Sequence, residues 1–123
     1  MTVNEKKDLI TELCKLWQCT LIDHHKDSDA HFYIKMKWSY GNEPVYIVEH
    51  YGYILEETYM EFESYSEAQD YLIKYLIEAL TNECDFYLAN PNNEEFVEQF
   101  KSRFITIKNA LIQIKERIKC NQE

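Results

Sequence analysis

The chain has little glycine and little proline. Only two residues of each occur in 123, which excludes a linker-like or low-complexity chain and leaves no glycine-rich loop to hold a phosphate. No run of about eighteen apolar residues is present, so the sequence predicts no membrane span. The length and the 46% hydrophobic content predict one domain, residues 1–123, with a sizeable core.

Two further absences bear on location and redox state. The N-terminal residues contain neither an uninterrupted apolar segment nor a small-residue cleavage site, both of which a secretion signal requires. The four cysteines show no C-x-x-C spacing. We therefore expect a cytoplasmic protein whose thiols are reduced.

The signatures of catalysis are also missing. There is no G-x-S-x-G motif and no cysteine in a recognisably basic stretch, so we expect no enzyme, no catalytic residues and no cofactor. One polar cluster, residues 23–31, contains three histidines and three aspartates that suit zinc or manganese. Its adjacent His24 and His25 would point to opposite faces of a strand, which disfavours a metal site. A metal protein or small enzyme built on this cluster is the third hypothesis.

Positive charge is almost absent from the middle of the chain. Thirteen carboxylates lie between Tyr40 and Glu95 and only Lys74 opposes them, so this acidic segment carries −12. From Phe96 onward the sign reverses, to +3. An acidic protein repels nucleic acid and anionic membranes and attracts basic surfaces. The predicted partner is therefore a basic protein, and neither nucleic acid nor a membrane.

Hydrophobic periodicity predicts an α+β fold that begins with a helix and continues as a sheet. Residues 4–18 have helical spacing, after a capping box formed by Thr2 and Glu5. Alternation and β-branched residues then predict a three- to four-stranded antiparallel meander. Its strands are residues 20–24, 31–38, 45–51 and 53–62, with a hairpin around Gly52. The face predicted to be buried in the second of these carries Phe32, Ile34, Met36 and Trp38.

Two helices follow, and both are expected to pack on one face of the sheet. The first begins at a cap on Ser64 or Ser66 and ends near Thr81, before a linker over residues 82–92. The last is long and has a heptad seam, widened by Ile105 and Ile112. The seam consists of Val97, Phe100, Phe104, Ile107, Leu111, Ile114 and Ile118. Its width favours packing within the molecule over a coiled-coil dimer, so we expect a monomer or weak homodimer.

The strand predicted over residues 53–62 has one face that is too polar for a core. That face mixes tyrosines, which offer contact area at low entropic cost, with carboxylates, which attract a basic partner. The alternative is an outer sheet face that is merely solvated. We favour partner binding because ten tyrosines exceed what solubility requires. The predicted partner-binding residues are Glu49, Tyr53, Glu57, Tyr59, Glu61 and Glu63.

Two blocks of sequence carry a resemblance to a known family. Residues 46–59 place a strand that ends in an aromatic-x-x-x-Gly pattern before a second strand rich in glutamate. Residues 62–72 continue as a Ser-capped helix with a leading aromatic residue. Over residues 45–80 the chain resembles small bacterial immunity proteins of polymorphic-toxin systems, and is most similar to immunity protein family 63. This resemblance implies a non-enzymatic inhibitor that binds one cognate toxin.

Charge and resemblance together lead to one functional hypothesis and one main alternative. We expect an immunity protein, or antitoxin, that blocks a toxin with a basic active-site cleft, such as a nuclease. Its acidic sheet face would stand in for phosphate. The alternative is a regulatory adaptor or chaperone that binds a basic protein partner without any toxin being involved.

Overall fold

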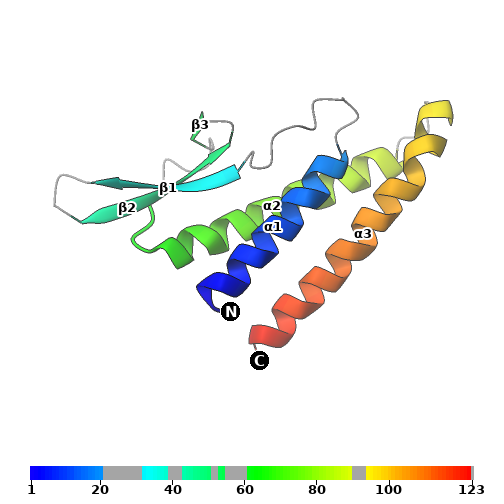
Figure 1. The fold of residues 1–123 in the computed structure, drawn as a ribbon. Coiled ribbons are helices and arrows are strands. Elements are labelled where there is room, and N and C mark those ends of the chain that lie inside the picture. Colours follow the sequence, from blue (N-terminus) through cyan, green and yellow to red (C-terminus); the bar gives the residue numbers. More distant parts are fainter. Residues whose placement is uncertain (21–31, 39–42, 51–52, 55–60, 90–93, 123) are drawn as a thin grey trace.

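The computed structural model describes residues 1–20, 32–38, 43–50, 53–54, 61–89 and 94–122. Within these residues three helices accompany a small antiparallel sheet (Figure 1). The elements in chain order are α1 (Val3–Thr20), β1 (Phe32–Trp38), β2 (Pro44–His50), β3 (Tyr53–Ile54), α2 (Tyr65–Ala89) and α3 (Glu94–Gln122). The predicted α+β class is confirmed at this level, and the described part is mostly helical.

The sheet has the order β1-β2-β3, and its pairing agrees with the predicted hairpin around Gly52, because His50 pairs with Tyr53. The full meander is not established in the described residues. β1 and β2 have seven residues each, whereas β3 has two. The strand predicted over residues 20–24 lies outside the described part, except for Thr20, which ends α1.

Both predicted N-terminal caps are present. The Glu5 amide donates to Thr2 Oγ1 at 3.2 Å, and the Thr2 amide donates to Glu5 Oε1 at 3.4 Å, which is a reciprocal capping box. At the start of α2 the Glu67 amide donates to Ser64 Oγ at 3.1 Å, so Ser64 is the cap. These hydrogen bonds satisfy backbone donors that the first turn of a helix leaves without partners.

The prediction of a linker over residues 82–92 is wrong for residues 82–89, because α2 continues to Ala89. Cys84 is fully buried, and Tyr87 and Leu88 are half-buried against the core. These side chains extend the apolar face of the helix by two turns beyond Thr81. Burial of that face outweighs the weak helix preference of Asn82 and its neighbours.

One core joins the three helices to the sheet. Leu13 of α1, Val48 of β2, Leu76 of α2 and Leu111 of α3 all belong to it. α1 lies along α2, and α2 packs against β1 and β2 (Figure 1). α3 packs against α2 and α1, so of the two helices expected on the sheet, α2 is the one that the structure places there.

Two predictions about buried apolar residues are wrong. Phe32 is buried and Ile34 is half-buried, but Met36 and Trp38 on the same face of β1 are 51% and 65% exposed. On α3, Ile105 and Ile112 are exposed, so the buried seam is narrower than predicted. Its described members are Phe104, Ile107, Leu111, Ile114 and, half-buried, Ile118.

Candidate partner-binding surface

Two of the predicted partner-binding residues lie at the surface immediately before α2. Glu61 and Glu63 are exposed and flank Phe62, whose backbone pairs with Tyr46 of β2 through two hydrogen bonds of 2.8 Å. Glu61 Oε1 lies 3.9 Å from Lys37 Nζ across the sheet. The two carboxylates are therefore held beside β2 by backbone pairing.

Glu49 lies in a different environment. It is 7% exposed, and its neighbour on the same face of β2, Ile47, is also buried. Val48, between them, points to the opposite face and joins the core. Both faces of β2 are thus covered at this level, and Glu49 has little surface to offer a partner.

The remaining predicted site residues are described only in part or not at all. Tyr53 belongs to β3, and its side chain is outside the described part. Glu57 and Tyr59 lie outside the described residues, as does the polar cluster 23–31. Among the residues that the structure describes, no group of three histidine, cysteine, aspartate or glutamate side chains is placed to hold a metal.

The pairing register of β2 tests the prediction that residues 53–62 form one regular strand. Glu49 pairs with Ile54, and Tyr46 pairs with Phe62. Tyr46 and Glu49 are three residues apart in β2, whereas their partners Phe62 and Ile54 are eight residues apart. The two intervals differ by five residues. An odd difference reverses which face a given parity occupies. The prediction that Tyr53 and Glu61 share one face assumed a regular strand over residues 53–62, and this register does not support that assumption.

The described tyrosines are mainly packing residues. Rings of Tyr46 and Tyr65 meet edge to face with centroids 5.7 Å apart, and Tyr71 stacks near Tyr75 at 6.4 Å. Tyr75 also lies 5.9 Å from the ring of Phe32. These side chains are half-buried and fasten the sheet onto α2. Part of the tyrosine content is thereby explained by the fold.

An exposed apolar pair lies at the same end of the hairpin as the acidic residues, but on the face of β1 opposite to Lys37 and its partner Glu61. Met36 faces Tyr46 across the β1–β2 pair, and Tyr46 in turn faces Phe62. Adjacent strands lie about 4.8 Å apart, so Met36 and Trp38 are roughly 10 Å from the segment that carries Glu61 and Glu63. We call residues 36–38, 43–46 and 61–63 the hairpin end.

The exposure of Met36 and Trp38 follows from where α2 begins. The ring contact between Tyr46 and Tyr65 lies at the first residue of α2. The hairpin of β1 and β2 continues past this point, as Figure 1 shows, so no turn of α2 covers its end. Strand alternation alone cannot reveal this, because the pattern is the same for a covered and an uncovered length of strand.

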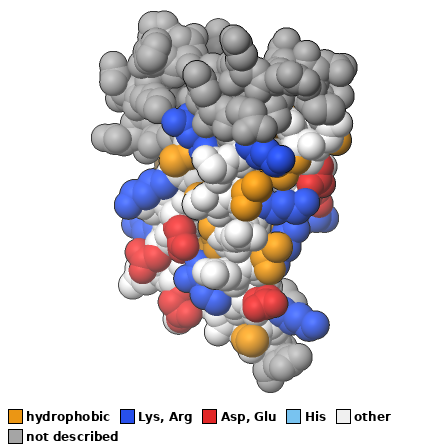
Figure 2. Space-filling view, turned by 90° about the vertical axis from the view of Figure 1, so that its right-hand side faces the viewer, with side chains coloured by type: hydrophobic (Ala, Val, Ile, Leu, Met, Phe, Trp, Pro, Cys, Tyr) orange, Lys and Arg blue, Asp and Glu red, His pale blue; other side chains and the backbone are white. Residues whose placement is uncertain are grey.

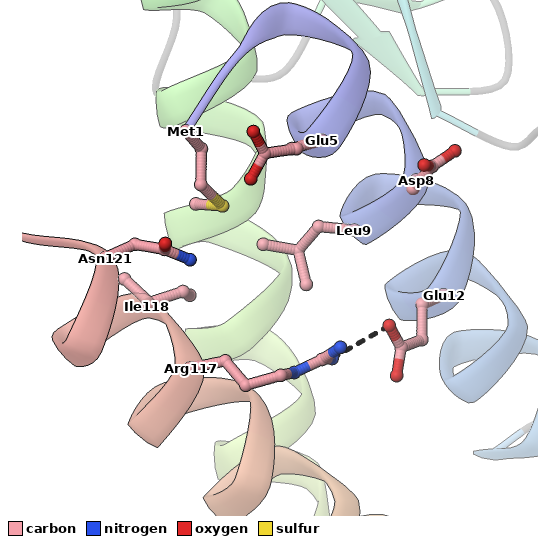
Figure 3. A pocket seen from close by; sticks show the side chains of 8 residues that line it. All are labelled: Met1, Glu5, Asp8, Leu9, Glu12, Arg117, Ile118 and Asn121. Atoms are coloured by element: carbon pink, nitrogen blue, oxygen red, sulfur yellow. Dashed lines mark hydrogen bonds and ion pairs between the residues drawn. The ribbon is translucent and has the colours of Figure 1, made fainter.

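Three of the hollows on the described surface lie away from the sheet. One of about 200 Å³, between α1 and α3, is lined by Leu9 and Ile118 and by the acidic residues Glu5 and Asp8 (Figure 3). A second, about 560 Å³ and open, runs between α2 and α3. A third, about 630 Å³ and open, adjoins Cys120 of α3. None of the three contains a histidine that could act as a base for a nucleophile.

Among the described residues, the groups with shifted pKa values lie away from the hairpin end. Burial, together with the nearby Asp85 and Glu83 carboxylates, raises the pKa of the Cys84 thiol to about 11. Burial also raises the pKa values of Cys14 and Glu83. A thiol with a raised pKa is a poor nucleophile, so Cys84 behaves as a core residue.

Comparison with protein-family models, with curated proteins and with solved structures finds no match. Among the described residues, no helix combines the length and the apolar character needed to cross a lipid bilayer.

Proposed function

We propose that this protein is a cytoplasmic immunity protein that binds and inhibits one cognate bacterial toxin through the hairpin end. The observation that carries the proposal is that the hairpin end exposes Met36 and Trp38 on one face and the carboxylate of Glu61, paired with Lys37, on the other, with Glu63 also exposed. Protein interfaces combine a few large apolar anchors with a polar rim, and tryptophan is enriched among the anchors.

The acidic segment supplies the second argument. Besides Glu61 and Glu63, its exposed carboxylates include Glu43, Glu67 and Glu78. A charge distribution of this kind accelerates encounter with a basic surface and fixes orientation, while apolar contacts slow dissociation. A toxin with a basic substrate cleft, such as a nuclease, has the complementary charge. Inhibition would be steric and electrostatic, with no chemical step.

The proposal retains Tyr53, Glu57 and Tyr59 as predicted contacts, because they belong to the same acidic segment. It places less weight on Glu49, which is buried. The runner-up function is an adaptor or chaperone for a basic protein. The same surface supports both functions, and they differ in whether binding abolishes a toxic activity.

Co-expression with the product of the neighbouring gene tests the proposal. If that product arrests growth and this chain restores it, the two proteins should also purify as a stoichiometric complex. Trp38→Ala should weaken that complex by at least about tenfold, because a buried tryptophan anchor contributes more than about 1.4 kcal/mol. A complex that forms without relieving toxicity would favour the adaptor.

A matched control separates the hairpin end from net charge. The pair Glu61→Lys and Glu63→Lys adds the same charge as the pair Asp8→Lys and Glu116→Lys, and all four residues are exposed. Only the first pair should impair protection. Equal loss from both pairs would show that overall charge matters rather than this surface, and intact protection in the first pair and in Trp38→Ala would place the interface elsewhere.

A further inference from the structure

α3 carries a second heptad seam beside the buried one. Shifting each position of the buried seam by one residue gives Ile105, Ile112 and Lys119, with Lys108 and Lys115 between them. Ile105 and Ile112 are 42% and 48% exposed, and the three lysines are exposed as well. Lys101 begins the series, so its steps are four and three residues in alternation. We call these six residues the second seam.

The second seam is strongly basic. From Lys101 to Asn121 the helix carries six basic residues and one acidic residue, Glu116. Two of its lysines touch α2, where Lys108 Nζ lies 3.2 Å from Asp85 Oδ1 and Lys115 Nζ donates to Thr81 Oγ1 at 3.4 Å. Both lysines are exposed, so these contacts neutralise the positive charge of the second seam only in part.

Apolar and basic side chains lie close together on this side of the molecule. Figure 2 shows hydrophobic side chains among lysines and arginines on the side that faces the viewer, with some carboxylates on the same face. Ile105 and Ile112 are seven residues apart, about 10 Å along the helix axis. That interval equals the repeat at which a second helix presents apolar residues along its own seam.

We propose that the second seam binds an acidic amphipathic helix of another protein. Leucine- or isoleucine-type residues of that helix would cover Ile105 and Ile112, and its flanking carboxylates would face Lys101, Lys108 and Lys115. Helix-in-groove recognition uses apolar anchors with this spacing. Flanking charges of opposite sign set the choice of partner.

Charge decides between this occupant and a second copy of the chain. Pairing two copies through α3 would bring the lysines of one second seam against those of the other, and like charges disfavour such a contact. Other α3 residues, among them Leu111 and Ile114, already pack in the core of the same chain. The second seam is thus left for a partner with negative charge.

This site is separate from the hairpin end. The described partners of α3 are α2 and α1, and in Figure 1 the sheet and α3 lie at opposite sides of the molecule. The second seam would therefore be open while the hairpin end is occupied. The inference does not depend on the proposed immunity function.

A synthetic acidic peptide tests the proposal directly. The probe has about three heptads, with leucine at positions a and d and glutamate at e and g. A second peptide with lysine in place of every glutamate is the charge control. Calorimetric titration of the intact protein should detect binding of the acidic peptide only, and the affinity should fall as salt is raised.

Substitutions in the seam complete the test. The pair Ile105→Ser and Ile112→Ser should lower the affinity for the acidic peptide at least tenfold while leaving the melting temperature nearly unchanged. Val3→Ser, at a position that is 43% exposed on α1, is the control and should bind normally. The proposal is overturned if the wild type binds neither peptide or both equally, or if the serine pair binds normally. It is also overturned if sedimentation shows a homodimer that the serine pair dissociates.

Discussion

At the scale of single residues, the contact between α1 and α2 depends on buried polar groups. Lys6 is buried, and its Nζ donates to Ser66 Oγ at 2.6 Å and lies 2.8 Å from Asp70 Oδ1. Gln69 is fully buried, and its Nε2 donates to the Val3 carbonyl at 3.1 Å. Such bonds fix the relative positions of two helices, because a buried donor without an acceptor is costly.

Lys6→Met should lower the free energy of unfolding by about 1 kcal/mol, because the apolar stem is kept while the charged hydrogen bonds are lost. Lys7→Met, at the adjacent exposed position, should change it by less than about 0.5 kcal/mol. Urea denaturation followed by circular dichroism measures both. Equal effects in the two variants would show that the buried contact contributes no net stability.

Glu83 is predicted to make stability depend on pH. Burial raises its pKa above the ordinary 4.5, so the folded protein holds the proton more tightly than the unfolded chain does. The resulting stability is fully present below pH 4.5 and is lost as pH rises through the folded pKa.

Glu83→Gln, which mimics the protonated carboxyl, should therefore raise the free energy of unfolding at neutral pH. The gain over the wild type should shrink toward zero in acid. Denaturation curves at several pH values measure the difference, with Glu116→Gln at an exposed position as the control. A gain that does not change with pH would contradict the assignment.

At the scale of elements, α3 is held by a narrow stripe. Leu111 is 2% exposed, whereas the next residue, Ile112, is 48% exposed. Neighbouring residues point about 100° apart around the helix axis, so a wide apolar side can include both Leu111 and Ile112. Which of them is buried depends on how α3 is rotated against α2, and this is a property of the packed structure.

Leu111→Ala should lower the free energy of unfolding by about 2–4 kcal/mol, because it leaves a cavity in the shared core. Ile112→Ala should change it by less than about 0.5 kcal/mol. Thermal and urea unfolding of the two variants give the comparison. A large loss in Ile112→Ala would mean that the second seam is covered in the isolated protein.

At the scale of the whole molecule, two exposed surfaces that each combine apolar and charged side chains lie apart from one another. The hairpin end combines Trp38 and Met36 with carboxylates, whereas α3 combines isoleucines with lysines. A protein with two surfaces of opposite charge can meet two different partners. The net charge of −9 means that a basic partner is attracted from a distance.

Association with a basic partner through the hairpin end should slow as ionic strength rises, because salt screens the long-range attraction. The pair Glu61→Lys and Glu63→Lys should reduce the association rate about tenfold at low salt, and the difference should narrow at high salt. Stopped-flow mixing or surface plasmon resonance measures both rates. An association rate that is independent of salt and of these substitutions would remove the electrostatic part of the proposal.

The sequence by itself determined that three helices form, where α1 and α2 begin, and most of the core, but it did not determine where α2 ends. Thr2, Glu5 and Ser64 act locally, within one turn of helix, so their hydrogen bonds can be predicted from neighbours along the chain. The spacing of Phe104, Ile107 and Leu111 likewise indicates the centre of the buried side of α3, although not how wide that side is.

The tertiary structure alone decided which apolar and acidic residues are at the surface. Met36 and Trp38 are exposed because α2 begins at Tyr65, beside Tyr46, and the hairpin extends past it. Glu49 is buried because both faces of β2 are covered at its level. Periodicity reports the face on which a side chain lies. Coverage of that face depends on elements distant in the sequence, and no local pattern encodes their positions.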